Sequence, residues 1–419
     1  MFLIDHPWMP VLHRHQGRIW ISPLQISDPD VLAFDADRAD FNGALAQFTI
    51  GLLQTTTPMN SPIGWKRMLE SPPDAETLEQ WFRPYREYFR LDGDSARFMQ
   101  DYSLRADTGT ENNVAALLIE APGEKTQKNN VDLFIKRNRI KGVCPHCAAL
   151  ALFCLQTNAP AGGAGIRTGL RGGGPLTTLL VSQHSTCLWR DLWLNICERD
   201  KFLGTAGDPD KKEPRFIFPW LADIGGIQTE SGQIAPIQVN PFHVFWATPR
   251  RVRLDMENLA PGDCDLCGRP SPGLISRFFT HPHGLNYKGA WQHPFSPYYE
   301  SQGEWLPVHP QPGGVGYRHW LPWVLGVNSK SRSIQRARVL SYRTSPPDSR
   351  LWAFGFDMDN MKARCWYEAT LPLYGLSGCD EDACRRLQAQ VEYWLAGADL
   401  AVFFLRTAVK NAWFDEARG

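Results

Sequence analysis

The sequence has no excess of either charge. Its 44 Lys and Arg residues balance 44 Asp and Glu residues, so no global field attracts the protein to nucleic acid or a membrane surface. A nucleic-acid site must therefore be a local patch. The sequence also lacks an apolar run of about 18 residues, so we expect no membrane span. Its first residues, MFLIDHPWMPVL, include an acid and two prolines, and we expect no signal peptide.

Common catalytic motifs are also missing. The sequence contains no GxxxxGK[ST], HExxH or GxSxG motif and no protein-kinase signature. The glycine-rich segment 159–175, APAGGAGIRTGLRGGGP, has seven glycines and no acid. It lacks the spacing and the following acid that a dinucleotide-binding loop requires. Nothing here argues for an enzyme, and the segment is either a nucleic-acid contact or a turn between core elements.

The composition is that of a folded protein with a large core. The chain has 419 residues, 43% of them hydrophobic, and its 16 Trp, 22 Phe, 35 Gly and 32 Pro indicate many aromatic contacts and turns. Ten cysteines, two pairs of them in CxxC spacing, fit metal binding in a reducing compartment better than a disulfide framework. We therefore expect a cytoplasmic protein.

Hydrophobic periodicity predicts an α+β fold. A large mixed N-terminal domain is expected over 1–368, and a helical C-terminal part over 369–419. The last predicted helix is apolar around much of its surface, so it needs partners. Short strands joined by turns are expected over 239–343. The predicted helices are 40–55, 75–89 with a break at Pro84, 145–157, 185–197 and 380–417.

Two cysteine pairs suggest a structural metal site. Cys144 and Cys147 form one CxxC knuckle, and Cys264 and Cys267 form another. Four thiolates suit a closed tetrahedral Zn²⁺ site, which is structural and not catalytic. Because 116 residues separate the pairs, two unrelated cysteine pairs remain the alternative. His146, inside the first knuckle, is an alternative ligand.

Three segments are rich in basic residues and poor in acids. They are 125–141, 329–343 and PRRVR at 249–253. The first contains Lys136, Arg137 and Arg139 and leads into the first knuckle and the glycine-rich segment. Such runs are commonly solvated faces, but together they favour a local nucleic-acid site.

Several motifs together resemble the CasA family, the large subunit of the type I-E CRISPR surveillance complex Cascade. They are LIDHPWMPV, GIRTGLRGGGPLTTLL, the two CxxC pairs, WQHPFSP and FGFDMDNMKARCWYE, and they span essentially the whole sequence. The resemblance implies a mixed α/β domain with a zinc site, followed by a helical bundle that is incomplete within these residues. It also implies a non-catalytic subunit.

The implied function is recognition of the protospacer-adjacent motif in double-stranded DNA. Strand separation and recruitment of a helicase–nuclease would follow, and the partners would be the other Cascade subunits, CRISPR RNA and target DNA. A loop before the first cysteine falls on 129–143. The implied minor-groove contact falls on Ala161, Gly162, Gly163, Ala164 and Gly165.

Two further DNA contacts follow from the resemblance. The polar wedge that holds the duplex open falls on Asn360, with Lys362 and Arg364 beside it. The minor-groove lysine has no clear match, and His281, His283 or Lys288 could take its place. The alternative functions are a zinc-stabilised nuclease with an irregular site and an RNA-binding scaffold.

Overall fold

The structure is a computed structural model. It describes residues 1–132, 137–184, 187–224, 232–289, 291–329, 332–359, 362–374, 376 and 380–414. The helices are α1 Ala39–Thr56, α2 Pro62–Glu70, α3 Ala75–Phe82, α4 Glu124–Lys128, α5 Pro145–Asn158, α6 Leu188–Trp193, α7 Arg199–Leu203, α9 Trp320–Val324 and α10 Glu381–Trp413. Within these ranges, none of the helices combines the length and apolarity that crossing a membrane would need.

The strands are short except in one hairpin. They are β1 Met9–His13, β2 Gly17–Ile21, β3 Val31–Phe34, β4 Thr110–Asn113, β5 Thr177–Ser182, β6 Arg251–Leu254, β7 Ala260–Asp263, β8 Pro270–Leu274, β9 Arg277–His281, β10 Tyr298–Ser301, β11 Glu304–Pro307, β12 Val327–Asn328, β13 Ser333–Gln335, β14 Ser349–Asp359 and β15 Lys362–Pro372. Their pairing is antiparallel throughout, in the sheets β2-β1-β3, β11-β10-β13-β12, β15-β14-β5, β4-β9-β6 and β7-β8. The fold combines helices with antiparallel sheets and has a helical C-terminal segment, which confirms the predicted α+β class.

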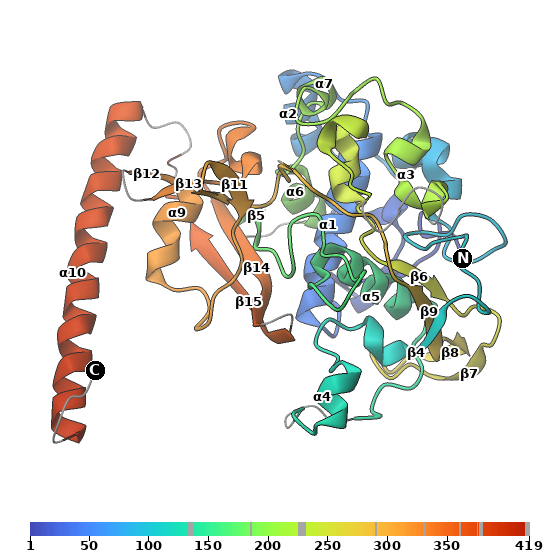
Figure 1. The fold of residues 1–419 in the computed structure, drawn as a ribbon. Coiled ribbons are helices and arrows are strands. Elements are labelled where there is room, and N and C mark those ends of the chain that lie inside the picture. The colour runs from blue at the N-terminus through green and yellow to red at the C-terminus, as the bar shows by residue number, and fades with distance from the viewer. Residues whose placement is uncertain are drawn as a thin grey trace.

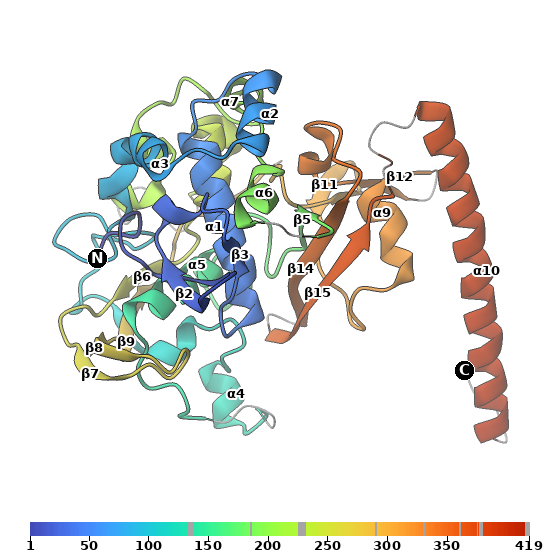
Figure 2. The ribbon, with the colours of Figure 1, turned by 180° about the vertical axis from the view of Figure 1, so that it is seen from behind.

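The core is built around α1 and α5. Both helices run through the middle of the main body, and they pack against each other (Figures 1 and 2). The helix predicted at 40–55 is confirmed as α1, and it is buried around nearly its whole circumference. It can be buried in this way because its other faces carry small or uncharged residues such as Gly43, Ala46 and Thr49.

Phe48 of α1 is the centre of an aromatic cluster. Its ring is fully buried and meets five other rings edge-on, with centroid separations between 5.3 and 5.9 Å. Edge-to-face pairs of this kind add to the free energy of area burial. The partners come from four separate parts of the chain: Trp8, Phe89, Phe98, Phe153 and Trp246.

Most predicted elements are confirmed, with shifts at their ends. The helix expected at 75–89 ends at Phe82, and a 3-10 helix continues from Arg83 to Phe89, because Pro84 has no N–H for an α-helical bond. The helix expected at 185–197 is shorter, with Leu188–Trp193 as α6. The motif FGFDMDNMKARCWYE falls on β14 and β15, each of 11 residues.

α10 lies to one side of the body, opposite the N-terminus (Figure 1). Asp380 caps it by accepting a hydrogen bond from the N–H of Ala383. Asp399 joins it to the body through Arg318, at 2.7 Å. Large apolar side chains are exposed along it: Tyr393, Trp394, Leu400, Phe403, Phe404, Leu405, Val409, Trp413 and Phe414. The four-helix bundle and the boundary at residue 368 stay predictions.

We predict that Phe48→Ala lowers the free energy of unfolding by about 3–5 kcal/mol, because it leaves a large cavity between five rings. Phe403→Ala on exposed α10 is the control and should change it by less than about 0.5 kcal/mol. Denaturant unfolding of the two variants measures both values. Equal losses would contradict a core centred on Phe48.

Candidate functional site

The four predicted cysteines come together in the fold. The sulfurs of Cys144, Cys147, Cys264 and Cys267 all lie within 4.8 Å of one another. Cys144 Sγ and Cys267 Sγ are 3.8 Å apart. Tetrahedral zinc with Zn–S bonds of about 2.3 Å would place its sulfurs about 3.8 Å apart, so the geometry fits such an ion. The group can hold a metal ion, and His146 is not part of it.

Local structure presents each thiol to this group. Cys144 is the N-cap of α5 and Cys147 lies in the first turn, where Pro145 is favoured because its missing N–H is not needed. The second knuckle is the turn between β7 and β8, and Gly268 adopts a φ of +69° there. The carboxylate of Asp265 accepts hydrogen bonds from the N–H groups of Lys141 and Gly142, at 2.6 and 2.8 Å. Hydrogen bonds therefore connect the two knuckles, in addition to the close approach of their sulfurs.

The glycine-rich segment is a loop that leaves the C-terminal end of α5. Its two limbs are bonded to each other at the base, since Gly169 N–H donates to Ala159 carbonyl at 2.9 Å and Gly174 N–H donates to Asn158 carbonyl at 3.1 Å. We call residues 159–175 the glycine loop. Its tip, residues 161–164, is exposed. The predicted contact residues therefore lie on the surface, on a loop with a fixed base.

The glycines of this loop are of two kinds. At the base, a Cβ on Gly173 would lie 2.8 Å from Pro160 Cα, and one on Gly169 would lie 2.8 Å from Thr157 carbonyl oxygen. These positions must be glycine for the chain to pack. At the tip, a Cβ on Gly163 would meet nothing within 4 Å, and its φ is not one that side chains avoid. The fold itself does not require glycine at 163.

Two arginines, Arg171 buried and Arg250 half-buried, hold the limbs of the glycine loop. Arg171, 3% exposed, donates to Thr177 Oγ1, Ser296 Oγ and Gln47 Oε1, at 2.9, 3.1 and 2.5 Å. Arg250 donates to the carbonyl of Pro160. Burial lowers the pKa of each guanidinium to about 10, so both stay charged at neutral pH. Sequence analysis placed Arg250 in a basic segment but did not find these bonds, because an arginine bonded to neutral acceptors has no local pattern.

The segment after β9 lies against the loop tip. His283 N–H donates to Gly165 carbonyl at 2.9 Å, and Arg167 Nη2 lies 3.5 Å from His283 Nδ1. Gly165 has a φ of +75°, and a Cβ there would come within 2.7 Å of Pro282. Of the three alternatives for the minor-groove contact, His283 is therefore beside the loop. The backbone N–H of Lys288 donates to the carbonyl of Ile234 and its side chain is exposed, while His281 Nδ1 lies 3.1 Å from Arg251 Nη1.

The predicted wedge hairpin is the pair β14 and β15. Its register runs from Arg350 opposite Pro372 to Asp359 opposite Lys362, with a bulge after Asp357. Lys362 is exposed at the end of the hairpin. The second predicted cation, Arg364, is paired at 2.7 Å with the buried carboxylate of Asp357. Asn360 lies outside the described residues.

The whole chain was compared with known proteins. It matches the family described as CRISPR-associated protein Cse1 (CRISPR_cse1) over residues 3–419. The chain belongs to this family. The resemblance inferred from its motifs is therefore confirmed.

Solved Cse1 structures share the fold. Thermus thermophilus CasA (Cse1) matches with a TM-score of 0.67 at 15% identity, over 94% of this chain and 80% of that one. Acidimicrobium ferrooxidans Cse1 matches with a TM-score of 0.64 at 19% identity, over 92% and 73%. A chain of a solved CRISPR RNA-guided surveillance complex matches with a TM-score of 0.68 at 16% identity, over 99% and 83%. At such identities, the likeness establishes the fold alone.

The first basic segment of this Cse1 chain is only partly available to a ligand. Arg137 forms two bonds to the carboxylate of Asp132, at 2.7 and 2.6 Å. Arg139 is exposed, and Lys136 lies outside the described residues. Of the predicted phosphate contacts here, Arg139 is therefore the described cation best placed to reach a ligand.

The other two basic segments serve mainly to hold the Cse1 fold together. In 329–343, Arg336 donates to Val324 carbonyl, Arg338 to Gln292, and Arg343 to Glu198. In 249–253, the arginines bond within the protein in the same way, to Pro160 carbonyl, Asp101 and Leu104 carbonyl. The arginines named here therefore already have partners within the protein, and a nucleic-acid contact through these runs stays a prediction. Sequence spacing does not reveal that their acceptors lie far along the chain.

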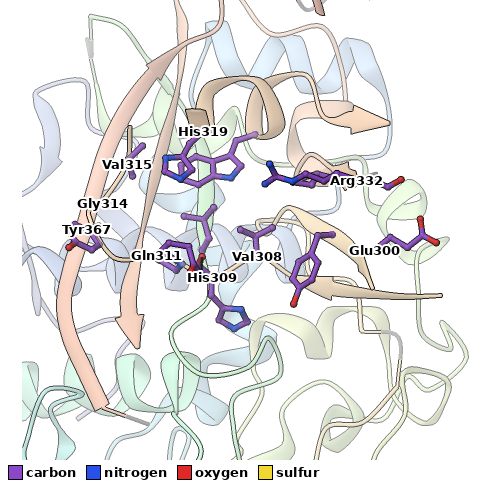
Figure 3. Close-up of a pocket in the computed structure, with 15 residues that line it drawn as sticks. Glu300, Val308, His309, Gln311, Gly314, Val315, His319, Arg332 and Tyr367 are labelled. Carbon is purple, nitrogen blue, oxygen red and sulfur yellow. Dashed lines mark hydrogen bonds between the residues drawn. The ribbon is translucent and has the colours of Figure 1, made fainter. Parts of the chain in front are cut away.

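A cavity of about 320 Å³ lies beside the base of the glycine loop (Figure 3). It is lined from β10, β13 and β15 and from the segment 308–323. The ring of His319 stacks on Trp323 at 4.6 Å. In Figure 3, Arg332 and Glu300 lie on one side of the cavity and Tyr367 on the other. The cavity thus separates the small four-stranded sheet from the β14–β15 hairpin.

The two kinds of glycine predict different effects of alanine substitution on the free energy of unfolding. Gly163→Ala should change the free energy of unfolding by less than about 0.5 kcal/mol, because the new methyl group meets open space. Gly173→Ala should lower it by about 1–3 kcal/mol, because the methyl group meets Pro160. Denaturant unfolding compares the two, and a greater loss for Gly163→Ala would contradict the described loop geometry.

Proposed function

We propose that this Cse1-family chain is the large, non-catalytic subunit of a CRISPR RNA-guided surveillance complex. In this role its glycine loop contacts double-stranded DNA at the protospacer-adjacent motif. The observation that carries the proposal is the open position of Gly163, which the fold does not need to be glycine. A glycine that packing does not require is explained if another molecule approaches the main chain closely there.

The chemistry of the loop suits the minor groove of DNA. That groove is about 6 Å wide, so exposed main chain without large side chains can enter it. The loop carries no acid, and Arg167 and His283 lie beside its tip. We assign to His283 the position of the minor-groove lysine that the family resemblance leaves without a match. The loop would read groove shape through its main chain, and the guanidinium of Arg167 would attract phosphates.

The β14–β15 hairpin would then start strand separation. Opening one base-pair step loses about 1.4 kcal/mol of stacking, and a polar side chain inserted beside the motif can offset part of that loss. Asn360 is the residue proposed for this insertion, with Lys362 and Arg139 near phosphates. The other proposed partners are CRISPR RNA, the remaining Cascade subunits and the helicase–nuclease, in the cytoplasm.

We also propose that the four-cysteine group holds Zn²⁺. Four thiols at tetrahedral spacing are the donor set that structural zinc prefers. The ion would neutralise part of the thiolate charge and join the start of α5 to the β7–β8 turn. Cys144, Cys147, Cys264 and Cys267 would all be ligands, which leaves no open position for catalysis.

We predict that Cys147→Ser removes bound zinc and lowers the melting temperature, because a structural zinc site contributes on the order of 10 kcal/mol to folding. Cys187→Ser, outside the group, is the control and should keep both properties. Elemental analysis of the purified proteins and thermal unfolding measure the result. A parent protein without zinc, purified without chelator, would refute the metal assignment.

We predict that Gly163→Leu weakens binding to motif-bearing duplex DNA at least roughly tenfold, equivalent to about 1.4 kcal/mol, because its side chain blocks the approach of the main chain. Gly397→Leu, at an equally open position on α10, is the control. Gel shifts of the complex reconstituted with guide RNA measure both, with duplexes that carry or lack the motif.

The same experiment separates the alternative functions. Equal retardation of the two duplexes would exclude motif recognition. If the isolated chain binds an RNA probe more tightly than it binds the DNA duplexes, the RNA-binding scaffold is favoured. DNA cleavage by the isolated chain in the presence of Mg²⁺ would favour the nuclease.

A further inference from the structure

The returning limb of the glycine loop packs directly on the backbone of β14. A Cβ placed on Gly174 would lie 2.7 Å from the carbonyl oxygen of Phe356 and 2.8 Å from Met358 Cγ. In the reverse direction, a Cβ on Gly355 would lie 2.6 Å from the carbonyl oxygen of Pro175. We call this contact, formed by residues 174–175 with residues 355–356 and Met358, the glycine seam. Each glycine is thus needed for the approach of the other segment.

The loop side of the seam is held firmly. Just before it, Arg171 bonds to side chains of α1, β5 and the segment before β10. A Cβ on Gly172 would lie 2.6 Å from His309 Nε2, so this limb is also packed against the wall of the cavity in Figure 3. The limb therefore has little freedom to move relative to the sheet.

The hairpin side of the seam is the central strand of its sheet. β14 pairs with β5 on one side, where Phe354 lies opposite Thr177, and with β15 on the other, where Gly355 lies opposite Tyr367. β5 is also the strand that the glycine loop enters, so the two segments share one sheet. From Gly355 to Asp359 the strand rises about 13 Å, at about 3.3 Å per residue. A shift at the seam is carried along this strand to the end of the hairpin.

We propose that the glycine seam sets the spacing between the loop that contacts the DNA duplex and the hairpin that opens it. Gly355 and Met358 are then positioning residues for strand opening, although neither touches DNA. This proposal rests on the proposed function of the loop and hairpin. It requires that a change at the seam affects opening more than it affects binding of the duplex.

Gly355→Ala tests the seam by adding one methyl group against Pro175. In the complex reconstituted with guide RNA, motif-duplex binding should stay within about twofold of the parent. The rate of strand opening should fall at least roughly tenfold, since misplacing a positioned group by about 1 Å can lower a rate up to about a hundredfold. A fluorescent base analogue next to the motif reports opening. A bubble already opened at that position should restore the parent signal.

Two further variants keep the test sharp. Gly109→Ala is the matched control, because its Cβ would lie 2.9 Å from Phe279 Cβ, in another sheet. It should open DNA at the parent rate. Met358→Ala removes a side-chain contact at the seam instead of crowding it. This variant replaces Gly355→Ala in the test if Gly355→Ala does not fold. It should also slow opening while binding is retained.

Each outcome has one meaning. If the parent complex does not bind motif duplex, the proposed function fails, and the seam fails with it. If the parent binds and opens DNA but both seam variants open it at the parent rate, only the seam proposal is overturned. It is also overturned if binding and opening fall by the same factor, or if Gly109→Ala slows opening equally.

Discussion

The placement of α5 is the constraint on which the candidate site depends. This helix is buried along nearly its whole length, starts at the four-cysteine group and ends where the glycine loop begins. Its 14 residues span about 21 Å at 1.5 Å per residue. Any rotation or slip at the cysteine end would therefore move the loop at the other end. α1 restricts such movement from the side, and the hydrogen bonds from Lys141 and Gly142 to Asp265 hold the segment just before the helix.

Hydrogen bonds from two arginines also hold the base of the glycine loop, which begins at the end of α5. Arg171 and Arg250 have no carboxylate among the partners described for them, and burial lowers the pKa of both. Leaving a buried charge unpaired is costly, but the hydrogen bonds of Arg171 to three neutral oxygens offset part of the penalty. The value of Arg171 is geometric, because its guanidinium bonds three segments at once, whereas Arg250 holds the other limb through the carbonyl of Pro160. The loop thus has a rigid base and an exposed tip, a suitable arrangement for meeting another molecule.

The sequence was most informative where the signal is local. CxxC spacing and the hydrophobic periodicity that predicted helices at 40–55, 145–157 and 380–417 depend on neighbouring residues, and α1, α5 and α10 confirm these helices. The sequence left open whether the two CxxC pairs, 116 residues apart, come together in space, and only the fold could test this. The arginines at 336, 338 and 343 looked available because their partners are remote in sequence. The seam was invisible for the same reason, since a glycine in a strand does not show what lies across it.

The charge balance of the chain now acquires a physical meaning. The chain has 44 residues of each sign, and arginines in two of its three basic segments bond within the protein. In the proposed function, long-range attraction to DNA would therefore contribute little. Phosphate contacts supply most non-specific affinity, so a chain with no net positive charge would bind random DNA weakly by itself. Recognition would then depend on the fit of the glycine loop to one groove and on base pairing by the guide RNA. Weak non-specific binding and precise placement of a few groups would both help the complex to find its motif. A complex that holds every duplex tightly could not search for it.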